Sequence, residues 1–137
     1  MEQEIRFCTT TDGMRIAYSL VGSGPPLVKA SNWLTHLEYE WSSPVWRHWW
    51  EELSKDYLLF RFDQLGSGLS DRSVPGQSFD AWVSDMEAVI TDTGLDTFPL
   101  LGIFQGGAKR TGRPLEEVTL QLRPDTNGRT RRGRLAF

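Results

Sequence analysis

The sequence predicts an α/β protein in which a β-hairpin precedes parallel strands that alternate with helices. An Asp12-Gly13 turn separates two short strand-like runs, at residues 5–8 and 14–21. Three short apolar runs follow, at residues 27–30, 57–62 and 98–103, and two helical segments lie between them. Short apolar runs that alternate with helices are typical of parallel strands covered on both faces.

Caps and apolar spacing predict the two helices. Ser43-Pro44 favours a helix start, because serine accepts from free backbone N–H groups and proline lacks an N–H that would need a partner. Ser78 is expected to cap the second helix and Gly94 to end it. We expect both apolar stripes to pack in the core rather than form a ligand site; they comprise Val45, Trp46, Trp49, Trp50 and Leu53, then Phe79, Trp82, Val83, Met86, Val89 and Ile90.

Composition indicates a cytoplasmic globular protein. The 137 residues are 39% hydrophobic and include six Trp, enough for one domain with its own core. A single cysteine, Cys8, excludes an internal disulfide and is expected to be a buried, inert thiol. The acidic start, Met1-Glu2-Gln3-Glu4, does not resemble a signal peptide, and no apolar run is long enough to cross a bilayer. We therefore expect no membrane partner.

The charge changes sign near residue 108. Residues 1–108 carry 7 Lys and Arg against 15 Asp and Glu, whereas residues 109–137 carry 8 against 3. The alternation of strands and helices also stops there. We therefore divide the chain into a domain, 1–108, and a basic tail, 109–137, which we expect to be disordered.

Two motifs point to a known superfamily. Leu101-Gly102-Ile103-Phe104-Gln105-Gly106-Gly107-Ala108 follows the last apolar run and resembles the G-x-S-x-G nucleophile elbow of the α/β-hydrolases. Residues 63–71, Asp-Gln-Leu-Gly-Ser-Gly-Leu-Ser-Asp, resemble the D-x-R-G-x-G-x-S-D loop of the same superfamily. The likeness covers residues 5–108 and is strongest to a bacterial branch often fused to adenylate-cyclase or LuxR-type regulatory modules. It implies the N-terminal half of that fold, and thus an incomplete α/β-hydrolase fold.

The resemblance also shows what the chain lacks. Phe104 stands where these enzymes carry the nucleophilic serine, and a phenyl ring has no atom that can attack a carbonyl. The superfamily places an Asp or Glu and then a His after the serine, but His36 and His48 both precede position 104. By resemblance the oxyanion donors are the backbone N–H groups of Gln105 and of Trp33 or Asn32, and Gly102, Gly106 and Gly107 shape the elbow. Leu65 replaces the usual arginine and is expected to loosen its loop.

The remaining polar candidates have structural interpretations. We expect Asp63 to fix a turn rather than act as a base, His36 to lie in a loop and His48 to be a solvated helix residue. Gly66-x-Gly68 lacks the third glycine of a dinucleotide loop, and Lys109 stands one place too late for a phosphate-binding P-loop. No cofactor and no metal are predicted.

The sequence thus predicts a truncated or degenerate α/β-hydrolase of serine-hydrolase ancestry, with ester- or amide-type substrates, that is inactive alone. The alternatives are a non-catalytic module that binds a small acyl-type ligand in the residual pocket or nucleic acid through the basic tail, and an enzyme completed by another chain. For the tail we favour a frameshift near codon 108 over nucleic-acid binding, because an Arg-, Gly- and Pro-rich stretch is typical of a GC-rich gene read out of frame. DNA sequence that shows no continuation of the family pattern in another frame would contradict this.

Overall fold

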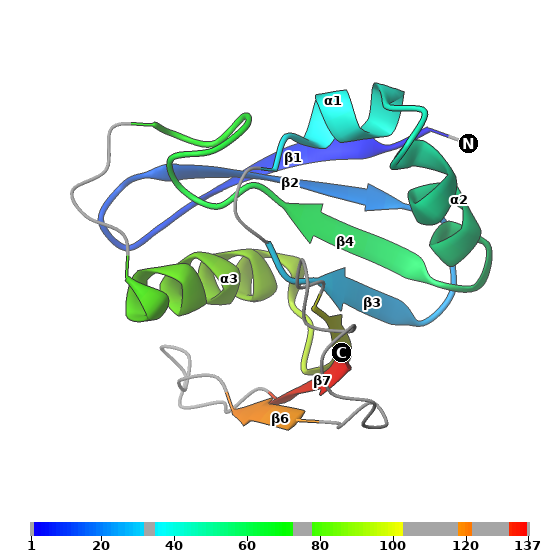
Figure 1. The fold of residues 1–137 in the computed structure, drawn as a ribbon. Helices are drawn as coiled ribbons and strands as arrows, with labels where there is room; N and C mark the ends of the chain where they lie inside the picture. Colours follow the sequence, from blue (N-terminus) through cyan, green and yellow to red (C-terminus); the bar gives the residue numbers. More distant parts are fainter. Residues whose placement is uncertain (1, 32–34, 73–77, 103–117, 122–131, 137) are drawn as a thin grey trace, which may run out of the picture.

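A mixed sheet with helices on both faces forms the core of the structure, a computed structural model that describes residues 2–31, 35–72, 78–102, 118–121 and 132–136 (Figure 1). Its strand order is β1-β2-β4-β3-β5-β7-β6. The strands are β1 (Glu4–Thr9), β2 (Arg15–Val21), β3 (Pro26–Lys29), β4 (Leu58–Phe62), β5 (Thr97–Leu101), β6 (Val118–Gln121) and β7 (Arg132–Ala136). The helices are α1 (Leu37–Ser42), α2 (Arg47–Asp56) and α3 (Phe79–Thr93).

The predicted hairpin and the predicted parallel strands are both confirmed. Strands β1 and β2 pair antiparallel, and Gly13 in the turn between them has a φ of 83°. Strand β3 lies between β4 and β5 and pairs parallel with each. Because parallel strands need a crossover connection, the segments that hold α1, α2 and α3 must cross a face of the sheet.

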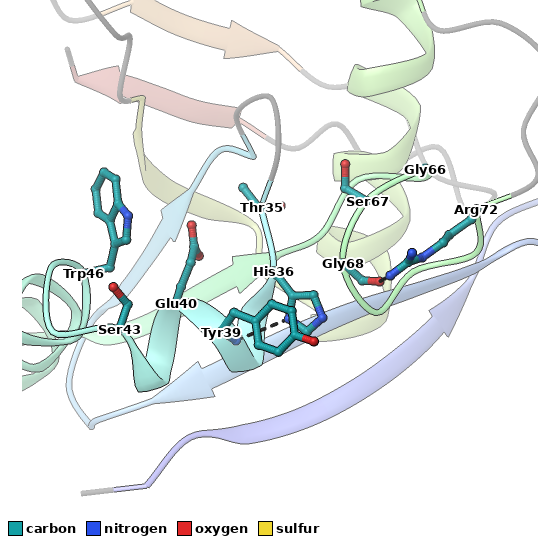
Figure 2. Close-up of a pocket in the computed structure, with 10 residues that line it drawn as sticks. All are labelled: Thr35, His36, Tyr39, Glu40, Ser43, Trp46, Gly66, Ser67, Gly68 and Arg72. Atoms are coloured by element: carbon teal, nitrogen blue, oxygen red, sulfur yellow. Dashed lines mark hydrogen bonds between the residues drawn. The ribbon is translucent and has the colours of Figure 1, made fainter.

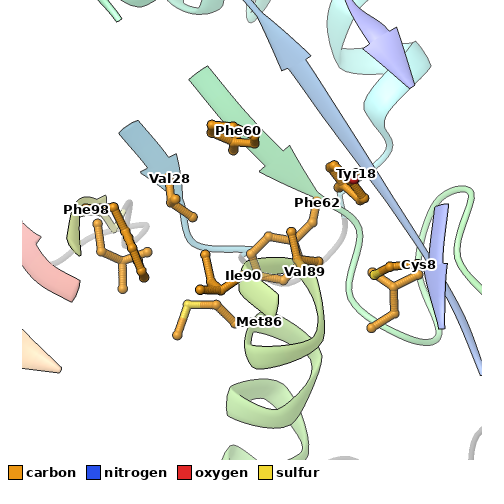
Figure 3. Close-up of a cluster of buried hydrophobic side chains, with 11 residues drawn as sticks. Cys8, Tyr18, Val28, Phe60, Phe62, Met86, Val89, Ile90 and Phe98 are labelled. Carbon is orange, nitrogen blue, oxygen red and sulfur yellow. The ribbon is translucent and has the colours of Figure 1, made fainter. Parts of the chain in front are cut away.

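Helix α3 covers one face of the sheet, as predicted from its caps. The Ser78 hydroxyl accepts a hydrogen bond from the Ala81 N–H at 3.2 Å, and Gly94 ends the helix with a φ of 74°. The helix buries Met86, Val89 and Ile90 against the strands (Figure 3). The cluster they join also contains Cys8, Ile16, Tyr18, Val28, Phe60, Phe62, Phe98 and Leu100.

Cys8 behaves as a buried core residue. Its side chain lies in the cluster under α3 with 6% exposure. Burial, together with the nearby carboxylates of Asp92 and Asp85, raises the pKa of the thiol to about 11. A thiol that stays protonated at neutral pH is a poor nucleophile, which agrees with the inert thiol expected from the sequence.

Helices α1 and α2 cover the opposite face and differ from the prediction. The helix expected from Ser43-Pro44 begins only at Arg47, because residues 43–46 form a turn in which the Ser43 hydroxyl accepts from the Val45 N–H. Trp50 is buried, but Val45 and Trp49 are 62% and 56% exposed, so the predicted stripe is only partly core. Helix α1, with only six residues, is too short for the apolar spacing to reveal it.

Two short strands lie in the tail, which was expected to be disordered. Strand β7 pairs parallel with β5 over five residues, and β6 pairs antiparallel with β7. Strand β5 is therefore not the sheet edge that a chain ending its fold at residue 108 would have. Long-range pairing of this kind leaves little trace in local propensity, which is why the sequence did not indicate it.

No helix in the described part of the chain has the length and apolar character needed to cross a bilayer.

Candidate functional site

The loops that could carry a site meet at one edge of the sheet. Strands β3, β4 and β5 run parallel, so their carboxyl ends share that edge. Lys29 at the end of β3 lies opposite Leu101 at the end of β5, and the Ala30 N–H donates to the Leu101 carbonyl at 2.9 Å. In open α/β sheets this is the edge where ligands bind.

A hollow of about 500 Å³ opens at this edge between α1 and the loop that follows β4 (Figure 2). One wall comes from the segment after β3 and from α1, and the other from the loop after β4. The lining residues are Thr35, His36, Tyr39, Glu40, Ser43, Trp46, Gly66, Ser67, Gly68 and Arg72. The volume is that of a site for a small organic molecule.

Asp63, the first residue of the loop after β4, anchors both walls. Its Oδ2 atom accepts hydrogen bonds from the backbone N–H groups of Leu37, at 3.2 Å, and of Leu69, at 2.9 Å. Gly68 lies directly against this carboxylate, since a Cβ atom there would come within 2.0 Å of Oδ2. Asp63 therefore holds the turn and the start of α1 together, which is the structural role expected from the sequence.

Two further side chains fasten the same loop to β2. The Ser70 hydroxyl accepts from the Ala17 N–H at 2.8 Å and donates to the Asp63 carbonyl. One Asp71 carboxylate oxygen accepts from the Arg15 N–H at 2.8 Å. These contacts explain the Ser-Asp pair at the end of the motif, because each satisfies a backbone group that the β2 ladder leaves free.

Leu65, which was expected to loosen its loop, has contacts to both the core and α3. Its side chain packs against the cluster under α3, and its N–H donates to the Asp85 carboxylate at 2.9 Å. Asp85 is 4% exposed, and burial raises the pKa of its carboxyl group, although the hydrogen bond from Leu65 acts in the opposite direction. The apolar side chain at position 65 thus adds to the core packing under α3.

Four charged side chains lie close to one another at the α1 wall, and one of them, Glu40, lines the hollow. Arg61 of β4 donates to the Glu40 carboxylate at 2.8 Å and to the Gln3 side-chain oxygen at 2.7 Å. Lys29 of β3 lies opposite Arg61 in the register, and both cations lie over the Trp50 ring, at 5.5 Å and 4.8 Å from its centroid. Burial raises the pKa of Glu40 and lowers the pKa of Lys29 to about 8. With Asp63, the group holds two cations and two anions.

The two histidines lie apart. His36 caps α1, where its Nδ1 atom accepts from the Tyr39 N–H at 3.3 Å and its ring stacks on the Tyr39 ring with centroids 3.8 Å apart. His48 is an exposed residue of α2, as expected. His36 does lie in a loop, but it also lines the hollow, which the sequence did not indicate.

Only the approach to the elbow is described. Strand β5 ends at Leu101 and Gly102 follows it, so the predicted strand before the motif is confirmed. The elbow and the oxyanion pair stay predictions, because their residues lie outside the described part of the chain. These residues are Phe104, Gln105, Gly106, Gly107, Trp33 and Asn32.

The hollow unites residues that sequence reasoning kept separate. The sequence singles out the Gly66–Gly68 loop and His36, but it gives no reason to single out Tyr39, Glu40 or Arg72. No local signal could have found them, because they come from two segments that only the parallel pairing of β3 and β4 brings to the same edge.

The fold and the position of the hollow define an α/β protein that places its site at the carboxyl edge of a parallel sheet. Comparison with solved structures finds several proteins with a similar fold. The epoxide hydrolase CorEH is 25% identical and covers 74% of this chain, with a TM-score of 0.62. An esterase from Rhodococcus sp. ECU1013 is 32% identical over 72% of the chain, with a TM-score of 0.59. A hydrolase from Pseudomonas aeruginosa PA01 shares 22% identity over 73%, with a TM-score of 0.63.

The chain belongs to the α/β-hydrolase superfamily, as the motifs of the sequence indicated. It spans about a third of the length of these three structures, namely 33%, 35% and 36%. No protein-family model matches the sequence.

Proposed function

We propose that this chain is a degenerate member of the superfamily, of serine-hydrolase ancestry, which does not catalyse acyl transfer. The observation that carries the proposal is Phe104, which stands at the nucleophile position of the motif three residues after β5 ends. Acyl transfer on this fold needs an oxygen or sulfur nucleophile activated by a neighbouring base, and a phenyl ring supplies neither the atom nor a titratable proton.

The histidines add support. His36 already accepts a hydrogen bond through Nδ1 from the backbone of α1, and His48 is exposed on α2. Neither follows position 104 in the sequence, as the base of the superfamily does. The ancestral substrates belong to the ester and amide class in this proposal.

Labelling with a fluorophosphonate probe and turnover of a p-nitrophenyl ester test the proposal. We expect no labelling and no release of nitrophenol. Phe104→Ser is expected to remain inactive as well, because the residues after 104 in this sequence include no histidine to act as base. A burst of nitrophenol from the unmodified chain would refute the proposal.

A second candidate function is non-catalytic binding of a small acyl-type ligand. The observation that favours it is the hollow at the carboxyl edge, whose walls are tied together by Asp63. Saturable binding of a small ligand without turnover, measured by calorimetry, would support this function. The absence of saturable binding in every calorimetric titration would exclude this function.

A further inference from the structure

The charges around the hollow are unequally compensated. Glu40 is the one carboxylate in the lining, and its side chain is 14% exposed. It is already paired with Arg61 at 2.8 Å, and the charge of Lys29 acts on it as well. A ligand cation placed beside Glu40 would therefore meet two buried cations, so this end of the hollow does not favour a positive group.

Arg72, unlike Glu40, has no ion-pair partner within the residues that the structure describes. It lies at the far side of the hollow from Trp46 and Ser43 (Figure 2). One of its terminal nitrogens donates to the Gly68 carbonyl at 3.2 Å, which holds the guanidinium at the mouth of the hollow. A guanidinium has five N–H donors, and among the described residues the hydrogen bond to Gly68 occupies one of its nitrogens.

The rest of the lining suits an uncharged, flat body. The stacked rings of His36 and Tyr39 form one wall, and Trp46, half-buried, stands beside Ser43 at the end away from Arg72 (Figure 2). Aromatic walls contribute binding through apolar contact and ring stacking, whereas the hydroxyl groups of Ser43 and Ser67 can orient polar substituents.

We propose that the hollow binds a small organic carboxylate, whose anionic group lies on Arg72 and whose apolar or aromatic body lies against the His36–Tyr39 stack. This inference rests on the ligand-binding candidate above and names its ligand class. Arg72, His36 and Tyr39, which carry it, all belong to the part of the chain that the structure describes.

Isothermal titration with phenylacetate and with phenylacetamide tests the proposal. The two probes have nearly the same shape, but only the first carries a negative charge. We expect phenylacetate to bind about fivefold more tightly than the amide, the size of one exposed charge contact. Arg72→Met should reduce the affinity for phenylacetate to that of the amide and leave the amide unaffected.

Arg6→Met is the matched control, because Arg6 is exposed on β1 and does not line the hollow. It should change neither affinity. Equal affinity of the two probes, an unaffected Arg72→Met variant, or no saturable binding of either probe would overturn the proposal. Nitrophenol release with probe binding intact would instead overturn the proposed loss of acyl transfer and leave this site standing.

Discussion

Arg61 and Glu40 form an ion pair at 2.8 Å although only 1% of the Arg61 side chain and 14% of the Glu40 side chain are exposed. The pair joins β4 to α1, so it connects the sheet to one wall of the hollow. Removing water from two charges costs several kcal/mol each, and their attraction offsets this cost only while both partners remain. Substitution of either partner alone should therefore lower the free energy of unfolding substantially.

Arg61→Met is expected to lower the free energy of unfolding by about 3 kcal/mol, because Glu40 is left buried with Lys29 as its one remaining cation. Urea unfolding followed by tryptophan fluorescence measures the change. The double variant Arg61→Met, Glu40→Leu should regain most of the loss, since no buried charge of the pair remains. Arg6→Met, which breaks an exposed pair with Glu4, should leave the midpoint unchanged. A loss below about 1 kcal/mol for Arg61→Met would show that water reaches the pair.

The pKa of Lys29, lowered by burial to about 8 from an ordinary 10.5, predicts a pH dependence. Between these two values the unfolded chain binds more protons at this lysine than the folded chain. The contribution of Lys29 to the free energy of unfolding therefore rises with pH across that window. Below pH 8 the lysine is charged in both states, and the folded chain bears the full cost of burying that charge. The groups that face Lys29 are Glu40, Arg61 and Asp63.

Comparison with Lys29→Met isolates this effect. The free energy of unfolding of the unmodified chain minus that of the variant should rise between pH 8 and 10, by at most about 1.4 kcal/mol per pH unit. Cys8 and Tyr18, whose pKa values burial raises to about 11 and about 12, titrate in both chains and cancel. A difference that stays flat across the window would mean that Lys29 keeps an ordinary pKa.

Gly68→Ala should disrupt the loop after β4. Gly68 has a φ of 53°, and a Cβ there would meet the Asp63 carboxylate at 2.0 Å. Gly94→Ala is the matched control, because Gly94 has a φ of 74° but nothing within 4 Å of the added atom. In the control, the free energy of unfolding should fall by about 1 kcal/mol, which is the backbone penalty alone. Gly68→Ala should cost roughly 2 kcal/mol more, from the clash. Equal losses in thermal melts would show that Asp63 moves aside freely.

Removal of residues 118–137 tests the pairing of β7 with β5. Without β7 the five residues of β5 lose their partner on that side, which makes β5 an unpaired edge strand of the truncated sheet. We expect a lower melting temperature and concentration-dependent aggregation, seen by light scattering. A shortened chain that melts cooperatively at the original temperature as a monomer would show that the tail adds nothing to the sheet, as expected of an out-of-frame segment.

Sequence reasoning succeeded where local chemistry was sufficient. The turn at Asp12-Gly13, the cap at Ser78 and the stop at Gly94 each depend on one residue and its immediate neighbours, and each was confirmed. It was wrong about the helix start at Ser43-Pro44, where the backbone makes a turn before α2 instead. Exposure of Val45 and Trp49 shows that helical spacing alone does not decide which face meets the sheet.

The amino-acid sequence by itself determined the superfamily, because motifs are properties of single positions. Phe104 at the serine position of the motif, on which the proposed loss of acyl transfer rests, is likewise read from the sequence alone. The tertiary structure alone decided the hollow and the buried charges at its α1 wall. Lys29, Glu40 and Arg61 come from three separate elements, and only the parallel pairing of β3 with β4 and the packing of α1 on them bring these side chains together. Contacts between segments distant in sequence have no local signal, because they are set by the register of the sheet.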